Sequence, residues 1–264
     1  MTLRGARGAR AAMFELSLDG PVARLTMDRP QARNGLRTED WRALAALIEQ
    51  AGRLKARAIL VRSLVPGWFS AGIDTGELAT LHADPAERLP YRNAMRQALD
   101  GIRHSPLPVI AEIDGACVGA GVALAAACDV RLAGPNASFA IPAARQGIGY
   151  LIEDIAGLRD LVGGGQAARL LLGAVRIDAA EAERIGLVEQ QGHDVARLAA
   201  DLAQDMAGHA PGALALLKQG LALAAAGRRA DEGHDRACDA ALGGAELAES
   251  YAAARERRRP DFAR

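Results

Sequence analysis

Two glycine-containing turns are the segments of this chain best suited to chemistry. They are residues 69–74 and 114–121, and each follows an apolar run typical of a buried strand. Small residues let a ligand approach the main chain closely, and the second turn opens an apolar helix whose first N–H groups have no partner inside the helix. Two N–H groups that converge on one carbonyl oxygen would stabilise an enolate or a tetrahedral oxyanion. The sequence therefore predicts a backbone oxyanion hole.

Other catalytic patterns are missing from the sequence. No Gly-x-Ser-x-Gly nucleophile turn occurs, the five histidines are scattered, and nothing has the spacing of metal ligands. Gly163, Gly164 and Gly165 precede a helical pattern but lack the Lys-Ser/Thr ending of a phosphate-binding loop, so they are typical of a tight turn. The three cysteines show neither metal spacing nor an even number, which favours reduced thiols in a cytoplasmic setting. We expect no metal and no separate cofactor.

Composition narrows the class of protein. Half of the 264 residues are hydrophobic, which is enough for one large domain or a domain with a helical extension. Lys plus Arg and Asp plus Glu are 32 each, so no basic excess favours nucleic acid or an anionic membrane as a partner. The basic run at 255–259 is interpreted as a solvated helix end, with a phosphate contact as the alternative. No uninterrupted apolar run reaches the ~18 residues of a membrane span.

The pattern along the chain predicts an α/β core. Alternating runs at 14–18 and 22–27 indicate a β-hairpin, and Thr38 is expected to cap a helix that ends near Leu54. Further strands and helices alternate up to residue 141, which favours mainly parallel pairing. The expected strands are 58–61, 109–113, 130–133 and 138–141, and the expected helices are 85–102 and 122–128.

From Gly163 onward the pattern is helical, with Asp178 and Glu181 fitting a capping box. The last helical segments are expected near 194–208, 211–226, 230–242 and 244–258. We predict three parts: a loose N-terminal extension over 1–12, a core over 13–204 and a helical region over 205–264.

Six segments carry a family resemblance. They are Arg-Pro-Gln-Ala-Arg-Asn at 29–34, Phe-Ser-Ala-Gly-Ile-Asp at 69–74, Pro-Val-Ile-Ala-Glu-Ile-Asp-Gly at 108–115, Ala-Cys-Asp-Val-Arg-Leu-Ala at 127–133, Ala-Ala-Glu-Ala with Gly-Leu-Val at 179–188, and Arg-Arg-Arg-Pro-Asp-Phe at 257–262. In this order and spacing, they resemble the crotonase superfamily, also called the enoyl-CoA hydratase/isomerase family.

The resemblance implies a spiral of β-β-α units with a helical C-terminal trimerisation region, assembled as a homotrimer or a dimer of trimers. It implies an acyl-coenzyme A thioester as ligand, with coenzyme A entering as part of the substrate, and a place in fatty acid metabolism. Carried over by position, Ala71 and Ala120 would donate the two oxyanion N–H groups. The residues expected to border the substrate and coenzyme A are Gln31, Ala32, Arg33, Gly72, Ile73, Asp74, Gly121, Ala123 and Ala143.

Two positions depart from the family's hydratases, which carry catalytic glutamates where this chain has Ala123 and Ala143. Hydration of a double bond needs a base to activate water and an acid to protonate the α-carbon. Two methyl groups can do neither. The resemblance therefore favours isomerisation or decarboxylation, and the alternative is a catalytically silent acyl-CoA-binding paralogue.

Substitute polar groups follow slightly downstream, at Tyr150, Glu153 and Asp154. Tyr150 coincides with a tyrosine of the family's methylmalonyl-CoA decarboxylases, in which loss of CO2 itself generates the enolate. Glu153 or Asp154 would serve instead as the proton shuttle of a double-bond isomerase. The structural alternatives are a tyrosine that only forms a pocket wall and acids that only complement a helix N-terminus.

Overall fold

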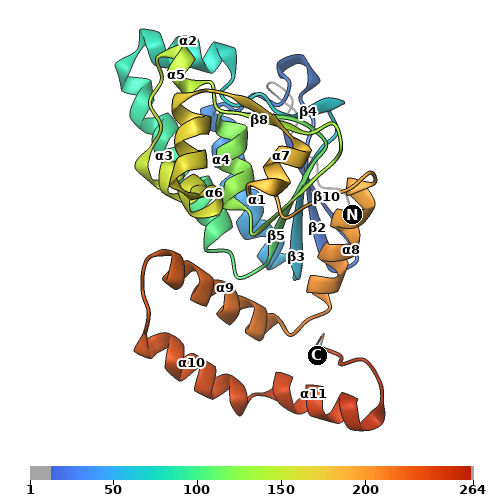
Figure 1. Cartoon of the computed structure of the whole chain (residues 1–264). Helices are drawn as coiled ribbons and strands as arrows, with labels where there is room; N and C mark the ends of the chain where they lie inside the picture. The colour runs from blue at the N-terminus through green and yellow to red at the C-terminus, as the bar shows by residue number, and fades with distance from the viewer. Residues whose placement is uncertain (1–12, 263–264) are drawn as a thin grey trace.

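The computed structural model describes residues 13–262, so the extension predicted for residues 1–12 lies outside the described residues. The strands form two sheets (Figure 1). The six-stranded sheet has the order β1 (Phe14–Asp19), β2 (Val22–Met27), β3 (Ala58–Ser63), β5 (Val109–Ile113), β7 (Val130–Ala133) and β10 (Gln190–Gln191). The four-stranded sheet has the order β4 (Gly67–Ser70), β6 (Gly115–Val118), β8 (Ser138–Ala140) and β9 (Arg176–Asp178).

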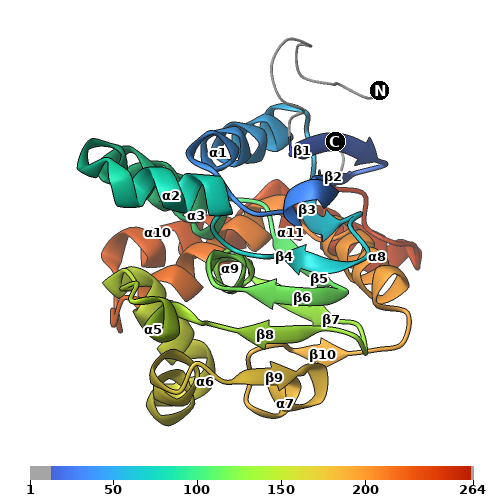
Figure 2. The ribbon, with the colours of Figure 1, turned by 90° about the horizontal axis from the view of Figure 1, so that it is seen from above.

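Consecutive strands alternate between the two sheets, because β3, β5 and β7 lie in the larger sheet while β4, β6 and β8 lie in the smaller one. Each such pair leads into helix: α2 (Thr75–Ala83) with α3 (Arg88–Arg103), then α4 (Ala120–Ala127), then α5 (Ala143–Gln146). Strands β2, β3, β5 and β7 pair in parallel, as do β4, β6 and β8. Figure 2 shows the resulting ladder of strands. The α/β class with mainly parallel pairing is confirmed, and the hairpin β1–β2 is antiparallel as predicted.

An apolar helix stripe holds this arrangement together. Trp41, Leu44 and Ile48 lie on one face of α1 (Thr38–Arg53) and are buried in a core that also contains residues of α3, α4 and both sheets. Burial of such a stripe is the main stabilising term for a surface helix. A second, smaller core lies between the other face of the six-stranded sheet and α8 (Val195–Ala207).

The N-terminus of α1 differs from the prediction. The cap is Arg37, not Thr38: the backbone N–H and the guanidinium of Arg37 both donate to the Asp40 carboxylate, at 2.8–3.0 Å. The Thr38 hydroxyl instead donates to the carboxylate of Glu77 on α2. A sequence pattern favours Thr as a cap by type, but here the Asp40 carboxylate satisfies the Arg37 N–H, and Glu77 of α2 accepts from both the N–H and the hydroxyl of Thr38.

Helix α6 (Ile152–Leu172) begins earlier than residue 163, where the sequence suggested that helical structure starts. Its backbone is interrupted at Gly163, whose φ of 75° is outside the helical region. Glycine tolerates this conformation at little steric cost. Helix α7 (Ala179–Arg184) follows β9, and the Asp178 carboxylate accepts from the Glu181 N–H at 2.8 Å, which confirms one half of the predicted capping box. The Glu181 carboxylate pairs with Arg169 and Arg184 instead of closing the box.

The last three helices lie beside the core and contribute only two buried residues, Lys218 and Ala253 (Figure 1). They are α9 (Pro211–Ala225), α10 (Glu232–Leu242) and α11 (Ala245–Glu256). The predicted division at residue 205 falls within α8, which packs on the six-stranded sheet. None of the helices in residues 13–262 is long and apolar enough to cross a lipid bilayer.

Lys218 joins α9 to the core. Its ammonium group, on a residue only 8% exposed, donates to the carbonyls of Ile102 and Leu107 at 3.0 and 2.9 Å and to the Asp129 carboxylate at 2.7 Å. Asp129 also accepts from the Val109 N–H at 2.7 Å. Burial raises the pKa of Asp129, and Lys218 opposes that shift. The ion pair therefore compensates a carboxylate that would otherwise be buried alone.

We expect Lys218→Met to lower the free energy of unfolding by about 2 kcal/mol. Removal of one partner of a buried pair costs roughly 3–5 kcal/mol, and this is reduced because Asp129 keeps 26% of its side chain exposed. Urea unfolding followed by circular dichroism measures the change. Arg197→Met is the matched control, since Arg197 forms only exposed pairs with Asp194 and Asp201. Equal losses in the two variants would contradict this role of Lys218.

Candidate functional site

The two glycine-containing turns meet at the end of the smaller sheet. A Cβ atom on Gly72 would lie 2.7 Å from the Val118 carbonyl oxygen and 3.1 Å from the Ala120 nitrogen, and the φ of Gly72 is +87°. Any side chain at Gly72 would therefore force the turns apart. The close approach also explains Gly121, because its Cβ would lie 2.9 Å from the Cβ of Ser70. Both glycines bring the turns together and neither lines the cavity described below.

The N–H groups of the first turn are used differently from the prediction. The Ala71 N–H donates to the Arg33 carbonyl at 2.9 Å, and the Gly72 N–H donates to the Ser70 hydroxyl at 3.1 Å. The Ala71 amide is thus engaged, which corrects its predicted role as an oxyanion donor. The sequence of the turn does not reveal that the Ala71 N–H is engaged, because its acceptor, the Arg33 carbonyl, belongs to a loop far away in sequence.

Ile73 supplies the available amide instead. Leu36 pairs in parallel with Ile73: the Leu36 N–H donates to the Gly72 carbonyl at 2.7 Å, and the Asp74 N–H donates to the Leu36 carbonyl at 3.1 Å. Successive N–H groups of an extended segment point to opposite sides, so the Ile73 N–H points away from Leu36. In the described part of the chain this N–H has no hydrogen-bond partner.

Ala120, the other predicted oxyanion donor, carries a second amide that is left open. It is the first residue of α4, after Gly119 as the cap, so no carbonyl inside the helix can accept its N–H. Among residues 13–262 no other acceptor is found for it. The positive end of the helix dipole adds to the attraction for a negatively charged oxygen. Ile73 and Ala120 both line one cavity, which makes them the donor pair that the geometry supports.

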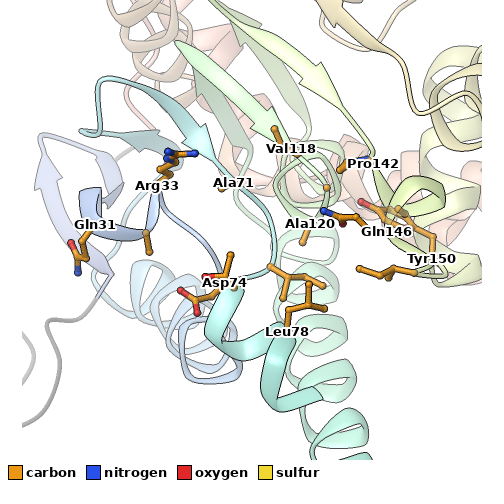
Figure 3. Close-up of a pocket in the computed structure, with 16 residues that line it drawn as sticks. Gln31, Arg33, Ala71, Asp74, Leu78, Val118, Ala120, Pro142, Gln146 and Tyr150 are labelled. Atoms are coloured by element: carbon orange, nitrogen blue, oxygen red, sulfur yellow. The ribbon is translucent and has the colours of Figure 1, made fainter. Parts of the chain in front are cut away.

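This cavity has a volume of about 470 Å³ and is called the thioester cavity after the ligand proposed for it below. Figure 3 shows Gln31 and Arg33 on one side, Ala120 near the middle, and Gln146 and Tyr150 on the other side. The predicted site residues that line it are Gln31, Ala32, Arg33, Ala71, Ile73, Asp74, Ala120, Ala143 and Tyr150. Ala123, Glu153 and Asp154 do not line it. The lining residues that the sequence analysis missed are Thr75, Leu78, Val118, Gly119, Pro142, Gln146 and Ile148.

Two of the predicted coenzyme A residues also have structural partners. The Asp74 carboxylate caps α2 by accepting from the N–H groups of Gly76 and Glu77, and it forms an ion pair with the buried Arg29. The Arg33 guanidinium lies 4.9 Å from the centre of the Trp68 ring. This stacking holds a cation at the edge of the cavity, where it could meet a phosphate.

A second cavity of about 860 Å³ adjoins the first, because Ile73, Ala120 and Tyr150 line both. It lies between α2, α3 and the loop before α6, and we call it the acyl cavity after the role proposed for it below. The Asp154 carboxylate borders it with only 2% of its side chain exposed. Burial raises the pKa of Asp154, and the Arg103 guanidinium at 3.3 Å opposes that shift. A buried carboxyl with a raised pKa suits proton transfer.

The Tyr150 hydroxyl is buried and has no hydrogen-bond partner among the described residues. Burial raises its pKa, so the phenol stays protonated near neutral pH and can donate a proton or a hydrogen bond. Tyr150 and Asp154 both line the acyl cavity, and their polar groups are almost wholly buried.

Glu153 lies elsewhere. Its carboxylate pairs with Arg96 at 2.6 Å, and it lines neither cavity. Its own backbone N–H and then Arg96 lower its pKa. This is the arrangement of an acid that complements a helix N-terminus. No group of three or more potential metal ligands is found within residues 13–262.

The chain is similar in sequence to known proteins. The family model for "Enoyl-CoA hydratase/isomerase" matches residues 18–264. The chain is 32% identical over 243 residues to probable enoyl-CoA hydratase echA6 of Mycobacterium tuberculosis, covering 91% of this chain and 95% of that protein. It is 36% identical over 175 residues to probable enoyl-CoA hydratase 2, mitochondrial, of Arabidopsis thaliana, where the match spans 64% of this chain and only 56% of that protein.

Solved structures show the same fold. An enoyl-CoA hydratase/carnithine racemase from Magnetospirillum magneticum has a TM-score of 0.90 and 31% identity, covering 95% of each chain. An enoyl-CoA hydratase from Polaromonas sp. JS666 has a TM-score of 0.84 and 26% identity, covering 94% of this chain and 98% of that one.

Proposed function

Because this chain belongs to the enoyl-CoA hydratase/isomerase family, we propose that it binds an acyl-CoA thioester and stabilises the enolate of its acyl group. The observation that carries the proposal is the pair of unengaged N–H groups of Ile73 and Ala120 on one cavity. Two donors aimed at a thioester oxygen gain strength as negative charge develops on it, which lowers the barrier to enolate formation.

The two cavities suggest how the ligand would lie. With the thioester oxygen at Ile73 and Ala120, the acyl carbons would enter the acyl cavity towards Tyr150 and Asp154. Coenzyme A would extend along the other side, past residues 31–33 and Asp74, where Arg33 offers a cation for a phosphate. This orientation uses residues 31–33, Ile73 and Asp74 among the predicted contact residues that line the thioester cavity.

Isomerisation of a double bond is the reaction that these residues support best. The Asp154 carboxylate would take a proton from the α-carbon of a 3-enoyl-CoA, leaving a dienolate whose oxygen is held by Ile73 and Ala120. The same carboxyl group would return the proton to the γ-carbon and yield the 2-enoyl isomer. Ala123 and Ala143 can neither activate water nor deliver a proton, so hydration is not proposed.

Decarboxylation is the second candidate, and the Tyr150 hydroxyl favours it. Loss of CO2 from a malonyl-type thioester leaves an enolate without any base, and the enolate then needs one proton at the α-carbon. An unpartnered phenol at the acyl cavity could supply it. The catalytically silent paralogue would keep the cavity and the amide pair without turnover.

Incubation with a panel of acyl-CoAs tests these alternatives, with products separated by chromatography and weighed by mass spectrometry. The panel holds crotonyl-, 3-enoyl- and methylmalonyl-CoA. We expect an isobaric change of retention for the 3-enoyl substrate. Loss of CO2 from methylmalonyl-CoA would support decarboxylation, and retained ligand without any product would support the silent paralogue. A gain of water on crotonyl-CoA would contradict the account of Ala123 and Ala143.

The assembly is also proposed, as a homotrimer or a dimer of trimers. Helix α9 supports it, because Leu217 and Leu221 are 65% and 70% exposed on a helix that is apolar along most of its length. Exposed apolar residues in one element favour contact with a further subunit. Sedimentation of the full chain measures the assembly directly.

A further inference from the structure

A third hollow, which the proposed reaction does not use, adjoins the thioester cavity. It has a volume of about 410 Å³ and lies between α5 and the kinked helix α6, and we call it the α5–α6 groove. Ala143, Ile148 and Tyr150 line both the groove and the thioester cavity, so the two spaces adjoin at these residues. Figure 2 shows α5 and α6 side by side.

The groove exists because its walls are made of small residues. Ala144, Gly164, Ala167 and Ala168 contribute little more than backbone and methyl groups to it. The break of α6 at Gly163 redirects the helix next to Gly164, and no heavy atom lies within 4 Å of the position that a Cβ of Gly164 would occupy. Space of this kind is available to a ligand without any movement of the backbone.

The lining of the groove is apolar apart from one arginine, whereas the lining of the acyl cavity combines apolar and charged residues. Arg159 is the only charged side chain that lines the groove. The acyl cavity carries His82, Arg88 and Arg92 among its lining residues. An alkyl chain gains free energy from apolar walls and gains none from displacing water around cations. Ala143 at the junction places a methyl group where a glutamate would put a charge.

We propose that the α5–α6 groove holds the distal part of a long unbranched acyl chain, so that the preferred ligands are medium- to long-chain acyl-CoAs. This inference rests on the proposed function, since it needs the thioester at Ile73 and Ala120. The chain passes Ala143 and Tyr150 and continues along α6. A buried methylene is worth about 0.8 kcal/mol, which is about fourfold in Kd at 25 °C.

Equilibrium binding of butyryl-, octanoyl- and lauroyl-CoA to the full chain tests the proposal. We expect the affinity to rise by about fourfold for each methylene that enters the groove. Gly164→Phe fills the groove from a position with open space, and we expect it to weaken lauroyl-CoA binding at least tenfold while butyryl-CoA binding is unchanged. Gly157→Phe is the matched control, because Gly157 is equally open, lies on the same helix and does not line the groove.

Ala168→Phe fills the same space from one helical turn further along α6 and replaces Gly164→Phe if that variant does not fold. Lauroyl-CoA binding that is unchanged in a folded groove variant would overturn the proposal. So would loss of lauroyl-CoA binding only in Met95→Trp, which narrows the acyl cavity, because the chain would then lie there. A wild-type protein that binds butyryl-CoA without any chain-length preference also overturns it, while the proposed function survives. Absence of binding to every acyl-CoA contradicts the proposed function itself.

Discussion

Replacement of Ala120 by proline is expected to lower turnover by about 10²–10³-fold, the usual cost of losing one oxyanion donor. Proline has no N–H, and Ala120 is the first residue of α4, the helix position that tolerates proline best. The fold should therefore survive while one of the two donors is lost. Steady-state kinetics on whichever acyl-CoA the wild type converts measures the change, with circular dichroism as the check on folding.

Ala120→Gly is the control for this experiment, because it keeps the N–H and changes only the methyl group. We expect its kcat to stay close to that of the wild type. A well-folded Ala120→Pro protein with unchanged kcat would show that the first amide of α4 takes no part in the reaction. An equal loss in both variants would point to the methyl group rather than to the amide.

Asp154→Asn is expected to lower the rate of isomerisation by about 10²–10⁴-fold, the range for removal of a general acid–base group. The amide is nearly isosteric and can still accept from Arg103, but it cannot carry a proton between carbons. Arg103 also keeps its ion pair with Asp100 at 3.2 Å. Glu153→Gln is the matched control on the preceding residue, and we expect no loss because Glu153 faces Arg96 outside both cavities.

The pH profile separates a proton shuttle from a structural role. Because burial raises the pKa of Asp154, kcat/KM should fall with decreasing pH through a value above that of an ordinary aspartate. Asp154→Asn should lack this limb. Because folding raises the pKa of the Asp154 carboxyl, its contribution to the free energy of unfolding is present at low pH and is lost as the pH rises through the raised pKa. Replacement of Asp154 should therefore not destabilise the protein near neutral pH. A limb that persists in Asp154→Asn would contradict the assignment.

Much of the fold could be predicted because apolar runs mark the strands that are buried. The strands β3, β5 and β7 coincide with such runs, and their parallel pairing could be inferred from the helices between them. Helix α2 has no buried residue and hence no apolar stripe to reveal it. Strands β9 and β10 have three and two residues and exist through pairing with β8 and β7.

The sequence predicts which segments form the candidate site, but not which backbone amide of the first turn is left without a partner. The turn at 69–74 contains several N–H groups, and a loop distant in sequence decides which of them is engaged. The Arg33 carbonyl accepts from the Ala71 N–H, and the pairing of Ile73 with Leu36 turns the Ile73 N–H towards the cavity. Gln146 and Leu78 were missed because they belong to short or weakly patterned helices, α5 and α2. Glu153 and Asp154 are neighbours in sequence, but Glu153 pairs with Arg96 whereas Asp154 lines the acyl cavity. This difference depends on how α6 packs, which the sequence pattern does not show.

The central claim is that the Ile73 and Ala120 amides polarise a bound thioester carbonyl. Isotope-edited vibrational spectroscopy of crotonyl-CoA labelled with carbon-13 at the carbonyl tests it most directly, because hydrogen bonding to the oxygen weakens the C=O bond. We predict that binding lowers the carbonyl stretching frequency below its value in water, and that Ala120→Pro reverses most of this shift. A bound ligand whose carbonyl frequency equals that in water would contradict the account.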